Sequence, residues 1–467
     1  MSLPRWPRYN NLSLARTTGT GSGKLKFTQN TLAVKFIGGP HTCIPEIQEL
    51  HPPMRLLAFG LGLLLFSSVL PAAESAVVNL QFWTNQSRET DELFEQYSRE
   101  HPQIHVTVAQ SASRNLVDDP QRVICSIVGG DPADIILFDR FAVGEWAARG
   151  AFLPLDAFVA ADLRAGRPDA IRSDEYYAPC WSEALYQGKL YGIPMGTDDR
   201  VLYYNKDMFA KAGISAPPKT WSQLLVDGKK LTHAPNQYGL ALLGDQGEDA
   251  ICSIDSFIFS NGGHVLSADG KTAVVNSPAA VQAIKFLQNL AAIAPAGTVN
   301  RAESDAASLF TAGKVAMTLD GSWQQDTYTS QGGSKLHWGV AVPPAPDGKS
   351  FRGTLGGWNM VIFKQSAHPD AAWKFLSYLG QKAPQIAIAS ISPARIDAAQ
   401  SFLASKRIGA PVLLQTLKNG LPRDLSPIYP QISTVEQTML QNIFTGMSAQ
   451  QAADKAASDM NSALQSQ

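Results

Sequence analysis

Two adjacent carboxylates, Asp198 and Asp199, lie in the segment YGIPMGTDDRVLYYNKDMF, residues 191–209. A pair of carboxylates suggests glycoside hydrolysis, which needs them on opposite sides of the scissile bond, about 5 to 9.5 Å apart. The aromatic run after them indicates an extended strand, on which adjacent side chains point to opposite sides. The two carboxylates therefore do not share one substrate easily, and no metal-ligand pattern surrounds them. We expect neither a catalytic pair nor a metal site, and we expect Asp199 to face a domain interface or solvent, with Arg200 as a possible partner.

A second charged pair, Asp139 and Arg140, directly follows the apolar run ADIILF, residues 133–138. Ligands of open α/β sheets bind beyond the carboxyl ends of strands. A carboxylate accepts and a guanidinium donates hydrogen bonds, so together they suit vicinal hydroxyl groups. The alternative is a local ion pair that caps the next helix. We predict that both residues contact a ligand.

Other polar and aromatic residues also follow strand-like runs. Asn85, Gln86 and Ser87 come after the run VVNLQFW and are candidates to donate to hydroxyls. Trp323 follows the run KVAMTLD, and an indole face stacks well on apolar C–H faces, although Trp is more often buried in a core. Trp358 comes after Gly356 and Gly357, which permit close backbone approach to a ligand or hinge rotation.

The elements that must position these residues alternate between strand and helix. Strand, helix, strand, helix and strand are predicted over residues 77–83, 88–101, 103–110, 120–130 and 133–138. This order indicates a parallel sheet covered by helices. Further strands are predicted over 238–244, 314–321, 336–344 and 357–364, and further helices over 277–292, 368–379 and 448–464. We expect two α/β domains.

The N-terminal region carries an export signal. The run MRLLAFGLGLLLFSSVLPAAES starts at Met54 with a basic residue, continues with about fifteen apolar residues and ends in small ones, the layout of a signal peptide. A membrane anchor would need about twenty apolar residues. We assign 54–76 to the signal peptide. Residues 1–53 are polar and basic and lack clear periodicity, so we interpret them as a mis-assigned or disordered extension.

Net charge and cysteine content indicate which partners and which disulfides to expect. Of the formal charge of −1, residues 1–55 contribute +5, from seven basic and two acidic side chains, so the remainder carries −6. An acidic body does not indicate nucleic-acid or anionic-lipid binding. Beyond residue 76 three cysteines remain, Cys125, Cys180 and Cys252. Export would permit one disulfide among them, although small buried thiols are the simpler interpretation.

Five segments, taken in order, resemble a known family. They are GDPADIILFDRF, LYGIPMGTDDRVLYYNKDMFAKAGISAPPKTWSQL, FTAGKVAMTLDGSW, GGWNMVIFKQSAHPDAAWKFLSYL and SPAR. The chain from 77 to 464 is similar to bacterial extracellular solute-binding proteins of family 1, the sugar receptors of ABC importers. The resemblance implies a ligand-binding role for Asp139, Arg140 and Trp323. It also implies that Asp198 accepts from ligand hydroxyls, because the related proteins have an acidic ligand-binding residue at the same distance before the LYYNK segment. It also adds Arg395 as a ligand-binding candidate.

The family implies a fold of the α/β class, a two-lobed periplasmic-binding-protein clamshell with interleaved lobes and hinge crossings. We place the N-terminal lobe at 77–196 plus 359–400 and the C-terminal lobe at 197–358 plus 401–467. The resemblance implies crossings near the GIP…LYYNK segment, near GTLGGW and after SPAR. Closure of the hinge around the ligand is the expected motion.

The function that follows is transport of a mono- or oligosaccharide, or a polyol, without catalysis, cofactor or metal. The expected partners are the carbohydrate and the ABC permease subunits of the inner membrane, and the protein is expected to be a periplasmic monomer. Two alternatives stay open. A secreted carbohydrate-active hydrolase would release products, and a binder of a glycerol-phosphate-type polyol phosphate would need Arg or Lys converging on the anion.

Overall fold

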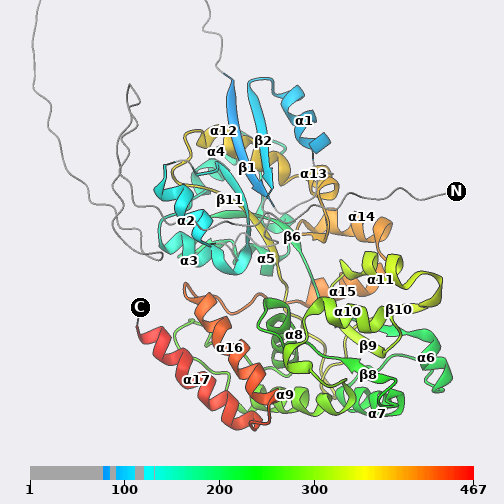
Figure 1. Cartoon of the computed structure of the whole chain (residues 1–467). Coiled ribbons are helices and arrows are strands. Elements are labelled where there is room, and N and C mark those ends of the chain that lie inside the picture. Colours follow the sequence, from blue (N-terminus) through cyan, green and yellow to red (C-terminus); the bar gives the residue numbers. More distant parts are fainter. Residues whose placement is uncertain (1–76, 85–90, 111–119, 131, 467) are drawn as a thin grey trace, which may run out of the picture. The chain divides into compact units, whose positions relative to one another are not determined.

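The computed structural model describes residues 77–84, 91–110, 120–130 and 132–466. The predicted signal peptide, the extension before it, and Asn85, Gln86 and Ser87 lie outside these ranges. Two sheets organise the described chain, and they lie in separate bodies of the ribbon (Figure 1). None of the helices found in the described ranges is long and apolar enough to cross a membrane.

The first sheet has six strands in the order β12-β6-β11-β3-β1-β2. The strands are β1 (Val78–Thr84), β2 (Ile104–Gln110), β3 (Ile135–Asp139), β6 (Gly192–Thr197), β11 (Gly357–Ile362) and β12 (Ser392–Pro393). Strand β1 runs parallel to both β2 and β3, which confirms the predicted strand-helix alternation. Strand β11 is antiparallel to β3 and β6. Residues far apart in sequence therefore meet at the same strand ends.

The second sheet has four strands in the order β10-β7-β9-β8. They are β7 (Val201–Asn205), β8 (Tyr238–Ala241), β9 (Val315–Asp320) and β10 (Trp338–Ala341). Strand β9 runs parallel to β8 and antiparallel to β7. The chain thus leaves the first sheet after β6, enters the second at β7, and returns between β10 and β11. A separate hairpin joins β4 (Leu185–Tyr186) to β5 (Lys189–Leu190).

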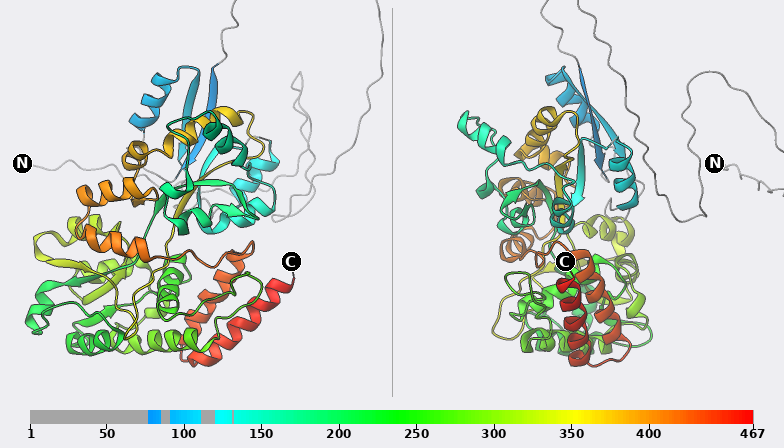
Figure 2. Two further views of the ribbon diagram at one scale, coloured as in Figure 1. Left: turned by 180° about the vertical axis from the view of Figure 1, so that it is seen from behind. Right: turned by 90° about the vertical axis from the view of Figure 1, so that its left-hand side faces the viewer.

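Helices cover these sheets, as two further views show (Figure 2). Before the second sheet begins come α1 (Asp91–Glu100), α2 (Pro120–Val128), α3 (Val143–Ala148), α4 (Asp156–Arg164) and α5 (Ala178–Ser182). From β7 to β10 come α6 (Lys206–Lys211), α7 (Trp221–Leu231), α8 (Glu248–Ser260), α9 (Pro278–Leu290), α10 (Glu303–Thr311) and α11 (Gln324–Gly332). After β11 come α12 (Pro369–Leu379), α13 (Lys382–Ala387), α14 (Ile396–Lys406), α15 (Ala410–Asn419), α16 (Tyr429–Phe444) and α17 (Ala449–Gln465).

Both faces of the first sheet are packed, as expected for strands without apolar-polar alternation. On one face, Phe82 meets Phe94 and Phe375 edge-on, with ring centroids 5.6 and 6.2 Å away. On the other face, Phe138 packs on Phe152 with centroids 5.2 Å apart. The two sheets and their helices form the α/β fold with two lobes. The lobe boundaries proposed from the sequence stay a prediction at the level of single residues.

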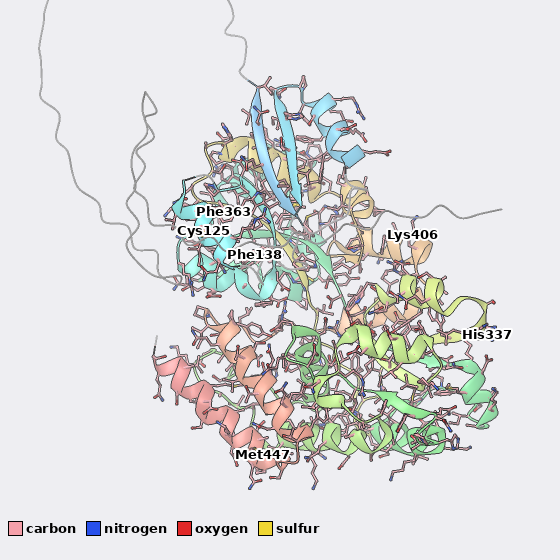
Figure 3. All side chains as sticks on the ribbon, viewed as in Figure 1. Cys125, Phe138, His337, Phe363, Lys406 and Met447 are labelled. Atoms are coloured by element: carbon pink, nitrogen blue, oxygen red, sulfur yellow. The ribbon has the colours of Figure 1, made fainter. Side chains whose placement is uncertain are left out.

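The three cysteines among the described residues do not form a disulfide with one another. Cys180 and Cys252 are buried, and all three are free thiols. Cys125 is exposed on α2 (Figure 3). Of the sequence's two interpretations, small buried thiols fit Cys180 and Cys252, and the single bridge among the three is wrong. Trp221 has a structural role, because it begins α7 and stacks on Phe286 with ring centroids 4.2 Å apart.

Candidate functional site

A cleft of about 540 Å³ opens where strands of the two sheets end. Six residues predicted from the sequence line it: Asp139, Asp198, Trp323, Gly356, Gly357 and Trp358. They come from the end of β3, the segment between β6 and β7, the turn after β9 and the start of β11. The topology therefore gathers most of the predicted candidates into one cavity.

One wall of the cleft is formed by neighbouring strands of the first sheet. Trp358 of β11 pairs directly with Asp139 of β3 and, on its other side, with Gly196 of β6. Gly357 has a φ of 130°, and a Cβ there would come within 2.3 Å of the Gly196 carbonyl oxygen. Glycine is therefore required at this position. The Gly356 amide donates to Asp198 Oδ1 at 3.0 Å, which holds that carboxylate at the cleft wall.

The opposite wall centres on Trp323 in the turn between β9 and α11. Its Nε1 donates to Glu303 at 2.8 Å, and the Arg200 guanidinium lies 5.0 Å from its ring centroid. Arg200 itself pairs with Asp198 at 3.2 Å and with Asp249 at 2.9 Å. Burial alone would lower the pKa of Arg200, but the surrounding negative charges, led by Asp198, raise it. Indole, guanidinium and carboxylates thus form one fixed cluster.

Arg423 joins the two walls at the base of the cleft. Its Nη2 pairs with Asp139 at 3.1 Å, its Nε with Glu183 at 3.2 Å and its Nη1 with Glu248 at 3.5 Å. The guanidinium lies beside two aromatic rings, 4.9 Å from the centroid of Phe141 and 5.7 Å from that of Tyr429, and these rings pack on each other with centroids 5.2 Å apart. Such a charge is stable in a buried site because its carboxylate partners satisfy its donors.

Asp139 has an unusual environment for a carboxylate. Burial raises its pKa to about 7, while Arg423 lowers it and the charges of Glu248 and Glu183 raise it further. One oxygen also accepts from the Phe141 amide at 3.3 Å, so the carboxylate caps the short helical turn at 140–142. Asp139 therefore lines the cleft and also caps the next helical turn. The local ion pair predicted as the alternative does not form, because Asp139 pairs with Arg423 and Arg140 pairs with Glu183.

A family model describes this chain. The model for bacterial extracellular solute-binding proteins matches residues 83–386, well over half of the sequence. The chain belongs to this family. Family members bind solutes, and a cleft at the strand ends of two sheets is where such a fold places its ligand.

Individual relatives agree with the family. The chain is 27% identical over 330 residues to a binding protein of Brucella abortus, an alignment that covers 70% of this chain and 76% of the relative. It is 33% identical over 202 residues to an ABC transporter-binding protein of Deinococcus radiodurans, covering 41% of this chain and 47% of that one.

Solved structures share the two-lobed fold. An ABC transporter solute-binding protein of Thermotoga lettingae, bound with α-D-tagatose, superposes with a TM-score of 0.70 at 25% identity, covering 83% of this chain and all of the other. The sugar-binding protein MalE of Xanthomonas citri gives a TM-score of 0.72 at 22% identity, covering 83% of this chain and 98% of that one. At 22% identity, the comparison with MalE shows only that the two proteins share a fold.

Two arginines predicted for the solute-binding site have other roles in the structure. Arg140 is fully buried and does not line the cleft, because its Nε pairs with Glu183 at 3.0 Å and its Nη1 donates to the Gly196 carbonyl at 2.8 Å. Its Nη2 donates to the carbonyls of residues 355 and 356. Arg395 precedes α14 and pairs with Glu175 at 2.9 Å and with Asp397 at 2.8 Å, also outside the cleft lining. Neither guanidinium is presented to a solute in this structure.

Asp199 points away from the cleft, as the alternation of an extended strand requires. It is buried and accepts a hydrogen bond from the Thr416 hydroxyl of α15. Burial raises its pKa to about 7, against the lowering effect of that bond. Of the two environments predicted for Asp199, a domain interface or solvent, its burial excludes solvent. Arg200 pairs with Asp198 and Asp249 instead of with Asp199.

Several lining residues escaped the sequence analysis. They are Arg200, Glu248, Asp249, Cys252, Glu303, Gln324, Thr327, Ser390, Ile391 and Arg423. Arg200 carried a usable signal, because it is two residues from Asp198 in the same extended segment and so faces the same side. Glu248 and Glu303 lie in the first turns of α8 and α10, where acidic residues are common for purely local reasons. No pattern in the neighbouring sequence identifies Arg423 as a cleft residue.

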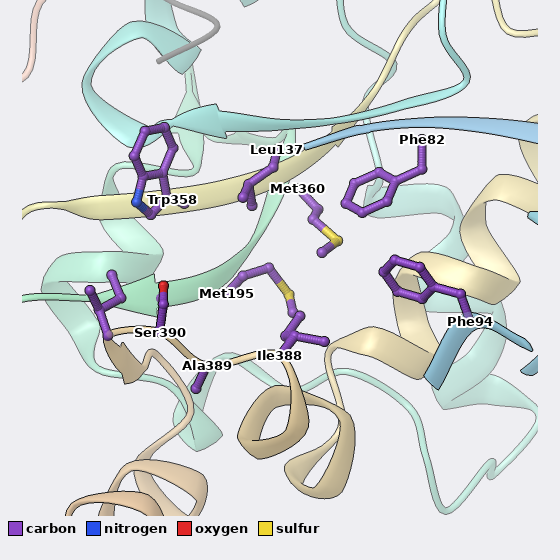
Figure 4. Close-up of a pocket in the computed structure, with 11 residues that line it drawn as sticks. Phe82, Phe94, Leu137, Met195, Trp358, Met360, Ile388, Ala389 and Ser390 are labelled. Carbon is purple, nitrogen blue, oxygen red and sulfur yellow. The ribbon is translucent and has the colours of Figure 1, made fainter. Parts of the chain in front are cut away.

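A small apolar pocket adjoins the cleft and shares Trp358, Ser390 and Ile391 with it (Figure 4). The side chains of Met195 and Met360 fill its centre, and its free volume is about 20 Å³. That space suits about one water molecule, so the pocket is a packing gap beside the site. Among the described residues, no cluster of three or more His, Cys, Asp or Glu is arranged to hold a metal ion.

Proposed function

We propose that this protein is the substrate-binding protein of an ABC importer and that it captures a mono- or oligosaccharide, or a polyol, in the cleft between its two sheets. One observation carries the proposal: indole side chains and carboxylates from both walls line a single cleft in a member of a solute-binding family. Indoles stack on the apolar faces of sugars, and carboxylates accept from their hydroxyls.

The relatives support the sugar and importer parts of the proposal. One similar structure holds α-D-tagatose, and another belongs to an ABC transporter solute-binding protein in complex with ribitol. The maltodextrin-binding protein of Bacillus subtilis is 28% identical over 216 residues. The ligand contacts we propose are Asp139, Asp198, Trp323 and Trp358, with Gly356 and Gly357 allowing close approach of the backbone.

The wider biological setting is part of the same proposal. The protein acts as a periplasmic monomer, exported through the signal peptide that begins at Met54, and it delivers its ligand to the permease subunits. In this proposal it binds without chemistry. Asp198 and Asp199 do not form a catalytic pair, because they face opposite sides and only Asp198 reaches the cleft. Incubation with oligosaccharides followed by chromatography should therefore return every sugar unchanged.

A thermal-shift screen of the purified protein against neutral sugars and polyols tests the proposal. A ligand that binds the folded state stabilises it by mass action, so at least one compound should raise the melting temperature. Isothermal titration of the best compound with Asp198→Asn and Trp323→Ala should show affinities at least ten-fold weaker, because each loses a direct contact. Asp459→Asn, at an exposed ion pair with Lys455, is the matched control. Absence of any carbohydrate or polyol ligand would refute the proposal.

A further inference from the structure

The cleft contains more negative than positive groups. Its lining includes five carboxylates and two guanidiniums, and no Lys or His side chain among the described residues. The carboxylates belong to Asp139, Asp198, Glu248, Asp249 and Glu303, and the guanidiniums to Arg200 and Arg423. The formal balance is therefore negative by three charges inside a partly enclosed cavity, where low-dielectric walls strengthen the field that a ligand experiences.

Neither guanidinium is available to an anionic ligand. Arg200 is 3% exposed in its side chain and is held between Asp198 and Asp249. Arg423 is 2% exposed and is shared by Asp139, Glu183 and Glu248. A carboxylate or phosphate that bound either one would have to displace an existing partner, and that partner would stay in the cleft without its counter-charge.

The other arginines considered for the site do not change this balance. Arg140 is bound to Glu183 and to backbone carbonyls, and Arg395 is bound to Glu175 and Asp397. Recognition of a phosphate or carboxylate normally uses a convergent, bidentate set of guanidinium or ammonium donors. The described part of the cleft offers no such set.

The acidic groups also respond to one another's charge. After burial, which is the largest cause, the pKa of Asp139 is raised by Glu248 and Glu183, and the pKa of Glu303 is raised by Asp249. A further negative charge in the cleft would add to this repulsion. A neutral ligand would not, and a positive one would relieve it.

We propose that the cleft selects ligands by charge: it binds neutral polyhydroxyl compounds and their ammonium derivatives, and it rejects the carboxylate and phosphate derivatives of the same compounds. This inference rests on the proposed function, because it concerns the same cleft. It argues against the polyol-phosphate alternative that the sequence left open. Like-charge contacts of this kind discriminate between partners more than they add affinity.

The test compares ligands that differ only in charge. The probes are the neutral sugar that binds most tightly in the thermal-shift screen and its 2-amino, uronate and 6-phosphate derivatives, titrated calorimetrically at low salt and at 300 mM NaCl. We expect the uronate and the phosphate to bind at least ten-fold more weakly than the parent sugar, and the amine at least as tightly. Both differences should shrink in high salt, which screens charges.

A variant of Asp249, a partly exposed residue of the cleft, tests whether the charge of the cleft causes the selectivity. Asp249 is 48% exposed in its side chain, so Asp249→Asn removes one negative charge and one partner of Arg200 without burying a new group. The ratio of uronate to parent dissociation constants should fall at least three-fold in this variant and stay unchanged in the Asp459→Asn control. An unchanged ratio in Asp249→Asn would contradict the charge mechanism.

The failures of the two proposals are distinguishable. If the uronate or the phosphate binds as tightly as the parent sugar, or if an anionic derivative alone binds, the charge proposal is wrong while the solute-binding function stands. If no sugar, polyol or derivative binds at all, both proposals are wrong.

Discussion

At the scale of single residues, the extended segment from Thr197 to Val201 directs the side chains of three charged neighbours to two opposite sides. Asp198 and Arg200 line the cleft, while Asp199 lies behind it against Thr416. The alternation was predictable from a period of two residues. The partners were not, because Asp249 and Thr416 come from helices 49 and 217 residues away in sequence.

The raised pKa of Asp139 predicts a pH-dependent affinity. The carboxylate faces Arg423, Glu248, Glu183 and the Phe141 amide, and its pKa is about 7. A hydroxyl donor prefers the ionised form, so binding should strengthen as the pH rises through 7. The ionised fraction grows from about one tenth at pH 6 to about nine tenths at pH 8, so affinity for a neutral sugar should rise roughly ten-fold.

Calorimetric titrations between pH 6 and 8 measure this effect. Asp139→Asn has no carboxyl group to titrate, so its affinity should be lower than that of the wild-type protein at pH 8 and should vary little with pH. An equally steep profile in Asp139→Asn would assign the titration to another group.

At the scale of secondary-structure elements, the turn between β9 and α11 places the indole that we propose as a sugar platform. The Trp323 ring lies directly over Gly321, and a Cβ at that glycine would lie 1.7 Å from Cζ3 of the ring. The Tyr203 hydroxyl donates to the Gly321 carbonyl at 2.9 Å and anchors the turn to β7. The position of the Trp323 indole thus requires glycine at residue 321.

Gly321→Ala should therefore displace the indole while leaving all the proposed contact residues in the sequence. Overpacking of this kind typically costs about 1 to 3 kcal/mol of stability. We expect sugar affinity to fall at least ten-fold and the tryptophan emission of the free protein to shift. Gly144→Ala is the control, since its new Cβ would make only an ordinary contact with Tyr186 at 3.9 Å. Unchanged affinity in Gly321→Ala would show that the indole is not a contact.

Strands were predicted from the sequence more accurately than the contacts that residues at the strand ends make. The apolar runs that became β1, β2, β3, β9 and β11 lie within two residues of the predicted bounds. Asp139 and Trp323 were placed correctly as residues at or just after strand ends, on β3 of the first sheet and β9 of the second. Arg140 was misplaced, since the residue after Asp139 turns into the body of the protein, where carbonyls and Glu183 take its donors.

At the scale of the whole molecule, one side chain connects segments from distant parts of the chain. Arg423 lies between α15 and α16 and reaches Asp139, 284 residues away, and Glu183, 240 residues away. It also reaches Glu248 at the start of α8. Contacts over such separations depend on how the lobes assemble, so no periodicity or local motif could have identified Arg423 from a single sequence.

Arg423→Met tests how much this network contributes to the folded state. Methionine keeps most of the side-chain volume beside Phe141 and Tyr429 but leaves Asp139 and Glu248 without their cation. Glu183 retains Arg140 as a partner. Breaking a buried ion pair by removing one member typically costs about 3 to 5 kcal/mol, so we expect a loss of that size in the free energy of unfolding, measured by urea titration.

The same titration supplies the control and the decisive comparison. Arg149→Met removes an exposed pair with Glu145, and pairs of this kind contribute at most about 1 kcal/mol. Adding Asp139→Asn to Arg423→Met removes one of the stranded carboxylates, so the double variant should recover part of the lost stability. If Arg423→Met instead cost no more than Arg149→Met, the carboxylates around Arg423 would have to be neutral already. In that case the cleft would lack the excess negative charge on which its selectivity against anions depends.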